Sequence, residues 1–369
     1  MALHAVGNID DAIDATKEFL LPFDLRRWLK LAVVVFFIGG GGTGGIQNAG
    51  NLQNVGDGGG PGGPGGPTGG FSLTAPLDVV PAPSAAVGQV APPGPGVPSD
   101  AAQALAGLGL VTVVLAVVVL LLVVITFAVV GAVMEFVFAQ SLMTTEVHVR
   151  RYFGEHLGNG LRLLAFRIVV GLVALLIFGG LLFAVFVLAV GGNLADVGPS
   201  AILGSLGLFV VVVVGMALVF GTINGFTNVF VVPLMIQGDD GVLAGWSRLW
   251  ASLTAEPKQY LVYLFLSVVL AIGVGIVGTL LGLVAFVVLA IPFGIVGAVF
   301  WFGLGEGLAA GVLVGVVALL FVLALLVVAN LIKAPLQSFL RYYAMLVLGD
   351  IDADLDPIPE VRASVRSDA

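Results

Sequence analysis

Charge and cysteine are both scarce in this sequence. Only 10% of its 369 residues are charged, whereas a soluble globular chain carries about 25% charged residues. Cysteine is absent, which excludes disulfide bonds and thiol chemistry. The net charge of −8 argues against nucleic acid as a partner, because a surface that binds nucleic acid needs positive charge.

Catalytic signatures are missing as well. The three histidines, His4, His148 and His156, do not follow a metal-ligand spacing. Paired carboxylates, a catalytic triad and an activated nucleophile are not recognisable in the sequence. We therefore expect no metal, no cofactor and no catalytic residues, and the sequence favours a non-enzymatic protein over an enzyme.

Apolar residues dominate the chain instead. Hydrophobic residues make up 59% of it, and several apolar runs exceed the roughly 20 residues that a helix needs to cross a bilayer. No charged stretch between these runs is long enough to bury a core of its own. The sequence therefore predicts an all-α, multi-pass protein of the cell membrane, with the lipid bilayer as its main partner.

Positive charge sets the expected number of spans. All 14 lysines and arginines lie in four segments, 17–30, 150–167, 248–258 and 333–366. Cytoplasmic segments of membrane proteins collect these residues. The apolar stretch 260–303 is long enough for two spans, but two spans would place the last cationic segment outside the cell. With one span every cation is cytoplasmic, so we predict six spans and two cytoplasmic termini.

Four regions follow along the chain. Residues 1–46 carry a surface helix and the first span. Residues 47–103 are rich in Gly and Pro, so we expect a disordered external loop. Residues 104–349 hold the other five spans, with an external or re-entrant hairpin at about 291–307. Residues 350–369 read as an acidic, flexible tail.

A repeated unit emerges from this division. Each unit begins with an amphipathic helix on the cytoplasmic surface, expected at 8–20, 146–157 and 242–254. We expect Asn159-Gly160 to break the second of these helices. An outgoing span and a returning span follow in each unit. The three units make three helical hairpins in a six-helix membrane bundle, related by an axis along the membrane normal.

A polar side chain recurs near the cytoplasmic end of each returning span. Asn228 is followed five residues later by Pro233, and Asn330 is followed in the same way by Pro335. Glu135 holds the matching place in the first unit. Polar groups in lipid are costly unless they face protein or water, so we expect all three to point inward. The prolines either bend or end their helices, and nearby polar side chains would bond the carbonyls that they free.

Further polar residues accompany these three. Glu135 and Arg167 lie at similar depths on neighbouring antiparallel spans, so we expect an ion pair that is either structural or part of an ion-linked gate. Asn224 shares a helix face with Asn228. These amides either hold helices together or line a cytoplasmic cavity for a lipid or small solute. Lys333 either contacts an anion or reaches the membrane interface with its amine.

Tryptophans mark the expected membrane interface at Trp28, Trp246 and Trp250. The segment from Asn228 to Trp250 has the pattern Asn…Val-Pro-Leu-Met…Trp-Ser…Trp. The chain is also expected to have six spans, with a surface helix before the first, third and fifth. Together these features resemble a group of uncharacterised haloarchaeal membrane proteins. That group is distantly similar to the membrane domain that precedes the catalytic domain of some glycerophosphodiester phosphodiesterases. The resemblance implies a fold and a location. The catalytic domain of those enzymes has no counterpart in this chain.

Four functional classes stay open after this reading. We expect a non-enzymatic membrane scaffold or a passage for a small solute or lipid. An enzyme that acts on lipid headgroups and an accessory subunit of a membrane complex are the alternatives. The sequence does not identify a protein partner.

Overall fold

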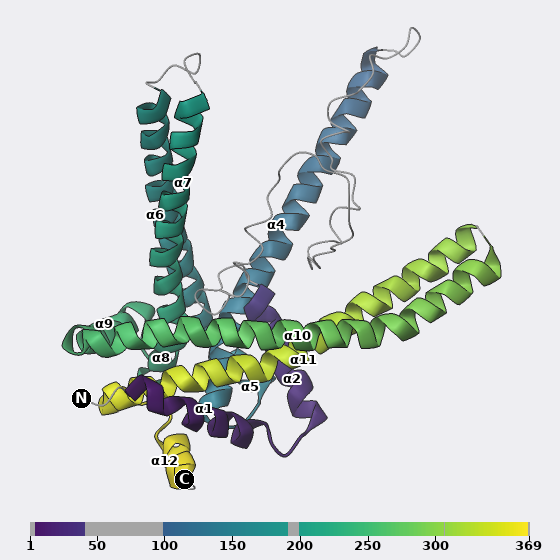
Figure 1. Cartoon of the computed structure of the whole chain (residues 1–369). Helices are drawn as coiled ribbons and strands as arrows, with labels where there is room; N and C mark the ends of the chain where they lie inside the picture. The colour runs from purple at the N-terminus through teal and green to yellow at the C-terminus, as the bar shows by residue number, and fades with distance from the viewer. Residues whose placement is uncertain (1–3, 41–98, 191–198, 306, 368–369) are drawn as a thin grey trace. The chain divides into compact units, whose positions relative to one another are not determined.

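A computed structural model describes residues 4–40, 99–190, 199–305 and 307–367 (Figure 1). Within these ranges every regular element is a helix, which confirms the all-α prediction for them. The elements are α1 (His4–Leu20), α2 (Leu25–Gly40), α4 (Ser99–Met143), α5 (Val149–Glu155), α6 (Leu157–Val190), α7 (Pro199–Phe226), the π-helix η3 (Thr227–Val231), α8 (Val232–Gly238), α9 (Val242–Ala255), α10 (Pro257–Leu304), α11 (Leu308–Ile351), the 3₁₀ helix η4 (Ala353–Leu355) and α12 (Pro359–Ser367). The loop expected at 47–103 lies outside the described residues as far as residue 98.

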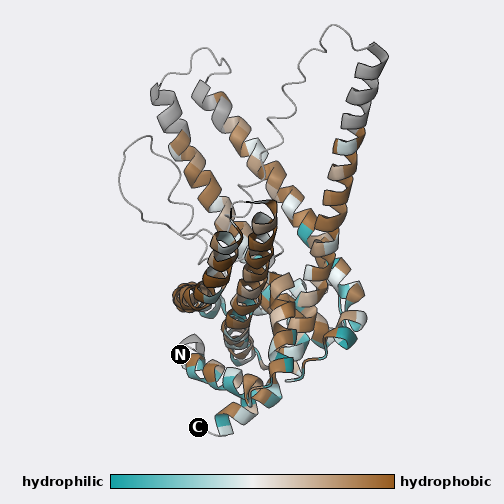
Figure 2. Cartoon of the chain, turned by 90° about the vertical axis from the view of Figure 1, so that its right-hand side faces the viewer, coloured by the Kyte–Doolittle hydropathy of each residue, from teal (hydrophilic) through white to brown (hydrophobic). Residues whose placement is uncertain are grey.

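Five helices among the described residues are long and apolar enough to cross a bilayer. They are Val111–Met143, Leu157–Ala184, Leu206–Gly238, Pro257–Leu304 and Leu308–Ile351. Figure 2 shows apolar residues along these helices and hydrophilic residues on the short helices near the two termini. Helix α2 has only 16 residues, and the rest of the expected first span falls in residues that are not described. The multi-pass membrane character is thus supported, and the sixth span stays a prediction.

The amino-terminal part of α4 belongs to a unit of its own. This unit is 51–126, of which the structure describes 99–126. The side chains from Val111 to Thr126 are all exposed. Residues 1–50 and 127–369 form the other unit, which contains the core and the polar residues considered below.

Helices α10 and α11 form a long antiparallel pair. The stretch that could have held two spans is a single helix, as expected. The hairpin expected from residue 291 is wrong as far as Leu304, because α10 continues through Pro292 and the chain turns only at Gly305, whose φ is 71°. The ring of Phe293 packs 5.6 Å from that of Phe321 on α11. Packing of this kind lets a helix continue past a proline in a membrane protein.

The buried core lies where the long helices end in polar sequence. Three continuous stretches are buried there: 131–139 in α4, 225–235 from α7 into α8, and 340–349 in α11. A helix is buried on all sides only when other elements surround it. Aromatic rings fill the middle of this core, including Phe230, whose centroid lies 4.9 Å from that of Tyr263. The core therefore surrounds the positions at which the polar side chains were expected.

The corner between α5 and α6 differs from the expected helix break. The break falls at His156 rather than at Asn159-Gly160, which lie inside α6. The imidazole stacks on the ring of Phe136 at 5.8 Å. Burial lowers the pKa of His156, partly opposed by the carboxylates of Glu155 and Asp239. The neutral ring therefore fits the apolar contact that fixes the corner.

The segment after residue 350 differs from the expected flexible tail. It forms η4 and then α12, which packs against α1. Arg366 holds α12 through its ion pairs with Asp11 on α1 at 2.9 Å and with Asp350 on α11 at 2.8 Å. These acids raise the pKa of Arg366, so it stays charged at any physiological pH. The acidic composition predicted a loose segment, but its two arginines hold two of its carboxylates in place: Arg366 pairs with Asp350, and Arg362 pairs with Asp356 at 2.8 Å.

Candidate functional site

Four polar side chains from four elements meet in the core, and we call them the arginine–glutamate cluster: Glu135 on α4, Arg167 on α6, Asn228 on η3 and Arg341 on α11. Arg167 Nη2 donates to Glu135 Oε1 at 3.3 Å and to Asn228 Oδ1 at 2.6 Å. Arg341 donates to the other carboxylate oxygen of Glu135 and to the backbone carbonyl of Asn228. The Glu135 and Arg341 side chains are 4% and 1% exposed. The cluster is therefore shielded from solvent and joined through both oxygens of one carboxyl group.

The π-helix η3 explains why the Asn228 carbonyl is available to Arg341. In η3 each backbone N–H bonds the carbonyl five residues earlier, as Val232 N–H does with Thr227 O. The next donor in this register would be residue 233, which is proline and has no N–H. The carbonyl of Asn228 is thus left without its helical partner, and a buried carbonyl needs one. Arg341 supplies it, as expected for a carbonyl freed by Pro233.

Trp246 and Thr227 fix the same turn from the other side. Trp246 Nε1 donates to Thr227 Oγ1 at 3.1 Å, and the Thr227 hydroxyl donates to Ile223 O at 2.6 Å. A Cβ built on Gly245 would lie 2.8 Å from Val231 Cγ1, so α9 lies close against η3. These contacts hold the unusual backbone turn that presents Asn228 to both arginines.

The charges of the cluster do not balance within it. Two guanidinium groups, which are always protonated, face one carboxyl group. Nε of Arg167 and Nε of Arg341 are buried and lack a hydrogen-bond partner among the described residues. The Phe138 ring offers Arg341 a cation–π contact at 5.7 Å, which stabilises a desolvated guanidinium by about 2 kcal/mol. The arrangement suits a fixed structural junction, because both oxygens of the carboxyl group are already bonded.

The other polar residues predicted for the cavity do not join the cluster. Asn224 and Asn330 each turn back to their own helix, where their amides donate to Phe220 O at 2.9 Å and to Leu326 O at 2.7 Å. Lys333 is exposed. Pro335 lies inside α11, which continues to Ile351, so it does not end the helix.

Arg341 is the member of the cluster that sequence reasoning missed. The sequence placed it at the cytoplasmic end of the sixth span, as one of the cations that set the topology. In the structure α11 extends well past it, and Arg341 is surrounded by buried neighbours. A signal was present, because a charge followed by the apolar run Ala344–Leu348 is not the end of a hydrophobic segment.

The expected interfacial tryptophans have different surroundings. Trp28 Nε1 donates to Leu20 O at 3.3 Å, joining α2 to the end of α1. Trp246 points inward to Thr227, as described above. Trp250 is 58% exposed, so of the two tryptophans on α9 it is the one placed to meet a membrane interface.

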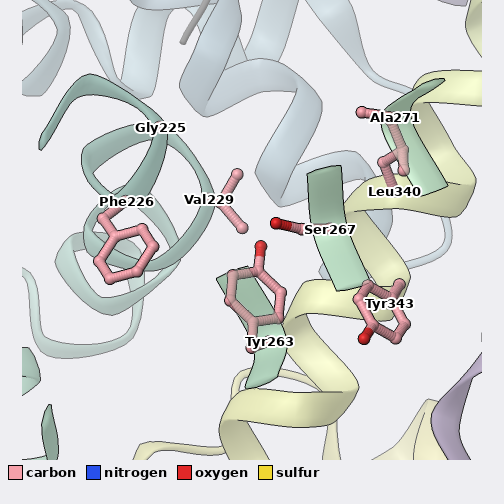
Figure 3. Close-up of a pocket in the computed structure, with 8 residues that line it drawn as sticks. All are labelled: Gly225, Phe226, Val229, Tyr263, Ser267, Ala271, Leu340 and Tyr343. Atoms are coloured by element: carbon pink, nitrogen blue, oxygen red, sulfur yellow. The ribbon is translucent and has the colours of Figure 1, made fainter. Parts of the chain in front are cut away.

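A small cavity lies beside the cluster (Figure 3). It has a volume of about 20 Å³, which is room for a single water molecule. Figure 3 shows the rings of Phe226, Tyr263 and Tyr343 around it. The full lining is Gly225, Phe226, Val229, Tyr263, Ser267, Ala271, Leu340 and Tyr343. A lipid or a solute larger than water does not fit this space.

The comparisons with known proteins identify a family and give no activity. Among the described residues, no group of three or more His, Cys, Asp or Glu side chains is placed to hold a metal ion. Neither a curated protein nor a solved structure matches the chain. The model of a family of unknown function (DUF7544) matches residues 3–358, and the chain belongs to that family.

Proposed function

We propose that this protein is a non-enzymatic membrane scaffold whose spans are joined at one end by the arginine–glutamate cluster. The observation that carries the proposal is the sharing of the Glu135 carboxyl group by Arg167 and Arg341, of which Glu135 and Arg341 are buried and Arg167 is partly buried. A buried ionic junction adds little to stability compared with apolar packing, but it can specify which helices pair and in which register. Such a junction is suited to holding spans in a fixed arrangement.

The cluster draws on each of the three hairpins in the proposed repeat. Glu135 comes from the returning span of the first hairpin, and Arg167 and Asn228 come from the two spans of the second. Arg341 comes from the returning span of the third. One junction can therefore set all three hairpins relative to one another, which supports the three-hairpin arrangement and the scaffold role together.

Passage of a lipid or small solute is the weaker candidate. It would need an open polar route, but Glu135 and Asn228 are bonded within the cluster, and the amides of Asn224 and Asn330 are bonded to their own helices. The cavity next to them holds about 20 Å³. The headgroup enzyme and the accessory subunit remain proposals without a contact that favours them.

Reconstituted liposomes separate the scaffold from the passage. We expect protein-containing liposomes to match protein-free ones in glycerol permeation, followed by light scattering after an osmotic step, and in flipping of a fluorescent phospholipid, followed by dithionite quenching. The reason is that the polar side chains of the cluster are bonded to one another and the cavity beside them has room for one water molecule. Protein-dependent flux that changes in Glu135→Gln would overturn the scaffold proposal and establish passage.

The absence of cysteine allows a direct test of the proposed six-span topology. We propose that both termini and α9 face the cytoplasm and that 47–103 is external, because the cations follow that division. In intact cells a membrane-impermeant maleimide should label Ser84→Cys and should leave Ser247→Cys and Ser367→Cys unlabelled until the membrane is opened. The cysteine-free parent chain is the background control. Labelling of Ser367→Cys in intact cells would contradict the topology.

A further inference from the structure

An open groove between α2 and α5 has no part in the scaffold proposal. It encloses about 830 Å³, within the range of about 300–1,000 Å³ that small-molecule sites occupy. Its lining consists of Lys30 from α2 and His148, Val149, Arg150, Arg151 and Phe153 at α5. Lysine and arginine thus make up half of the lining, three residues of six, in a chain whose net charge is −8.

Packing of α5 fixes which of its side chains face the groove. Tyr152 is buried, and its hydroxyl lies 3.0 Å from Thr144 Oγ1 at the end of α4. Val149 and Phe153 share that side of the helix and pack partly against the core. Arg150 and Arg151 are therefore left exposed. The groove is bounded by apolar groups on one side and by guanidinium groups on the other.

Two of the cations in the groove have no acid to balance them. Arg151 bonds Glu155 at 2.9 Å, and His148 lies 3.4 Å from the Glu146 carboxylate. Among the residues that the structure describes, Lys30 donates only to a neutral backbone carbonyl, that of Val147, at 3.3 Å. Arg150 makes no hydrogen bond or ion pair with any residue that the structure describes. Lys30 and Arg150 therefore present two free positive charges to the same groove.

The helices around the groove lead directly into apolar sequence. Lys30 immediately precedes the apolar residues of α2, and α5 is followed at Leu157 by a candidate span. A groove at such a level meets lipid headgroups, where a lysine or arginine gains about 1 kcal/mol near an anionic surface. Val149 and Phe153 offer an apolar contact for the glycerol and upper acyl chain of the same lipid.

We infer that this groove binds the phosphate of an anionic phospholipid between Lys30 and Arg150. The ligand class is a phosphodiester with net negative charge that comes from the surrounding bilayer. Lys30 meets it as a point charge, and the planar Arg150 guanidinium can donate two parallel hydrogen bonds to phosphate oxygens. The proposal is independent of the scaffold role, because none of these residues belongs to the arginine–glutamate cluster.

Native mass spectrometry of the full-length protein tests this inference. The protein is purified in micelles that contain equal amounts of phosphatidylglycerol and phosphatidylcholine, and the lipids retained on it are counted. Wild type should prefer phosphatidylglycerol. Each of Lys30→Gln and Arg150→Gln should weaken the retention of that lipid about five-fold, and the double variant about 25-fold, which corresponds to about 1 kcal/mol for each cation.

Matched variants and a competitor complete the design. Arg26→Gln removes an exposed cation of α2 that does not line the groove, so it should retain phosphatidylglycerol as wild type does. Lys30→Arg combined with Arg150→Lys keeps both charges and should keep most of the binding. An unchanged lipid preference in the double glutamine variant would refute the site. Displacement of the lipid by an equal concentration of inorganic phosphate would also refute it, since free phosphate would then be the ligand.

Discussion

Glu135→Gln is expected to lower the free energy of unfolding by about 3–5 kcal/mol, because breaking a buried ion pair leaves an uncompensated charge in the core. Here two guanidinium groups, those of Arg167 and Arg341, would lose their shared counter-charge. The glutamine keeps the size of the side chain and one carbonyl oxygen, so the loss measures charge rather than packing. Unfolding in mixed detergent micelles, followed by tryptophan fluorescence during titration with a denaturing detergent, gives the value.

The control for this experiment is Glu155→Gln. Glu155 forms an exposed pair with Arg151, and exposed pairs of this kind contribute little to stability because solvent screens them. A cost below about 1 kcal/mol for Glu135→Gln would show that the cluster is not buried as described. Combining Glu135→Leu with Arg341→Met should recover part of the lost stability, because it removes one buried guanidinium together with the carboxylate, while Arg167 and the Asn228 carbonyl still lose a partner.

Gly160→Ala is expected to destabilise the protein by about 1–3 kcal/mol, the usual cost of overpacking a core. A Cβ built on Gly160 of α6 would lie 2.9 Å from Cα and 2.5 Å from Cγ2 of Val133 on α4. The Val133 side chain can rotate, but its backbone cannot move without shifting α4. The same detergent titration measures the loss, and cross-linking between cysteines placed on α4 and α6 would report the change in their separation.

Gly171→Ala is the matched control on the same helix. No atom lies within 4 Å of a Cβ built there, so this substitution should stabilise the protein by about 0.5–1 kcal/mol through improved helix propensity. The two alanine variants should therefore change stability in opposite directions. If both stabilised the protein, α6 would not approach α4 at Gly160. Adding Val133→Ala to Gly160→Ala should restore part of the lost stability. It removes Cγ2 of Val133, one of the atoms too close to the new Cβ, but leaves the Cα of residue 133 in place.

The helices and part of the candidate site were predictable from local sequence. Long apolar runs identified the candidate spans, and the position of every cation favoured one helix over two in residues 260–303. The inward-pointing Glu135 and Asn228 followed from the high cost of polar groups in lipid. Pro233 was predicted to bend or end its helix and to free a carbonyl; the helix continues through it into α8, and the Asn228 carbonyl accepts from Arg341. Each of these inferences depends on residues close together in the chain.

The features that sequence reasoning missed depend on distant partners. Helices α10 and α11 continue through Pro292 and Pro335 because each packs against the other, which no local pattern reveals. Arg341 belongs in the core only because Glu135 lies far earlier in the chain, on another helix. Helix α12 (Pro359–Ser367) is held in place because its arginines meet acids of α1 and α11. Composition alone could not distinguish these paired charges from solvated ones.

The contact between α12 and α1 bears on whether the chain crosses the bilayer an odd or an even number of times. Since Arg366 pairs with Asp11, the first and last described helices occupy the same side of any bilayer that the intervening helices cross. A chain that starts and finishes on one side must cross an even number of times. Five crossings, the number of long apolar helices among the described residues, would place α1 and α12 on opposite sides, so their contact supports our proposal of a sixth crossing.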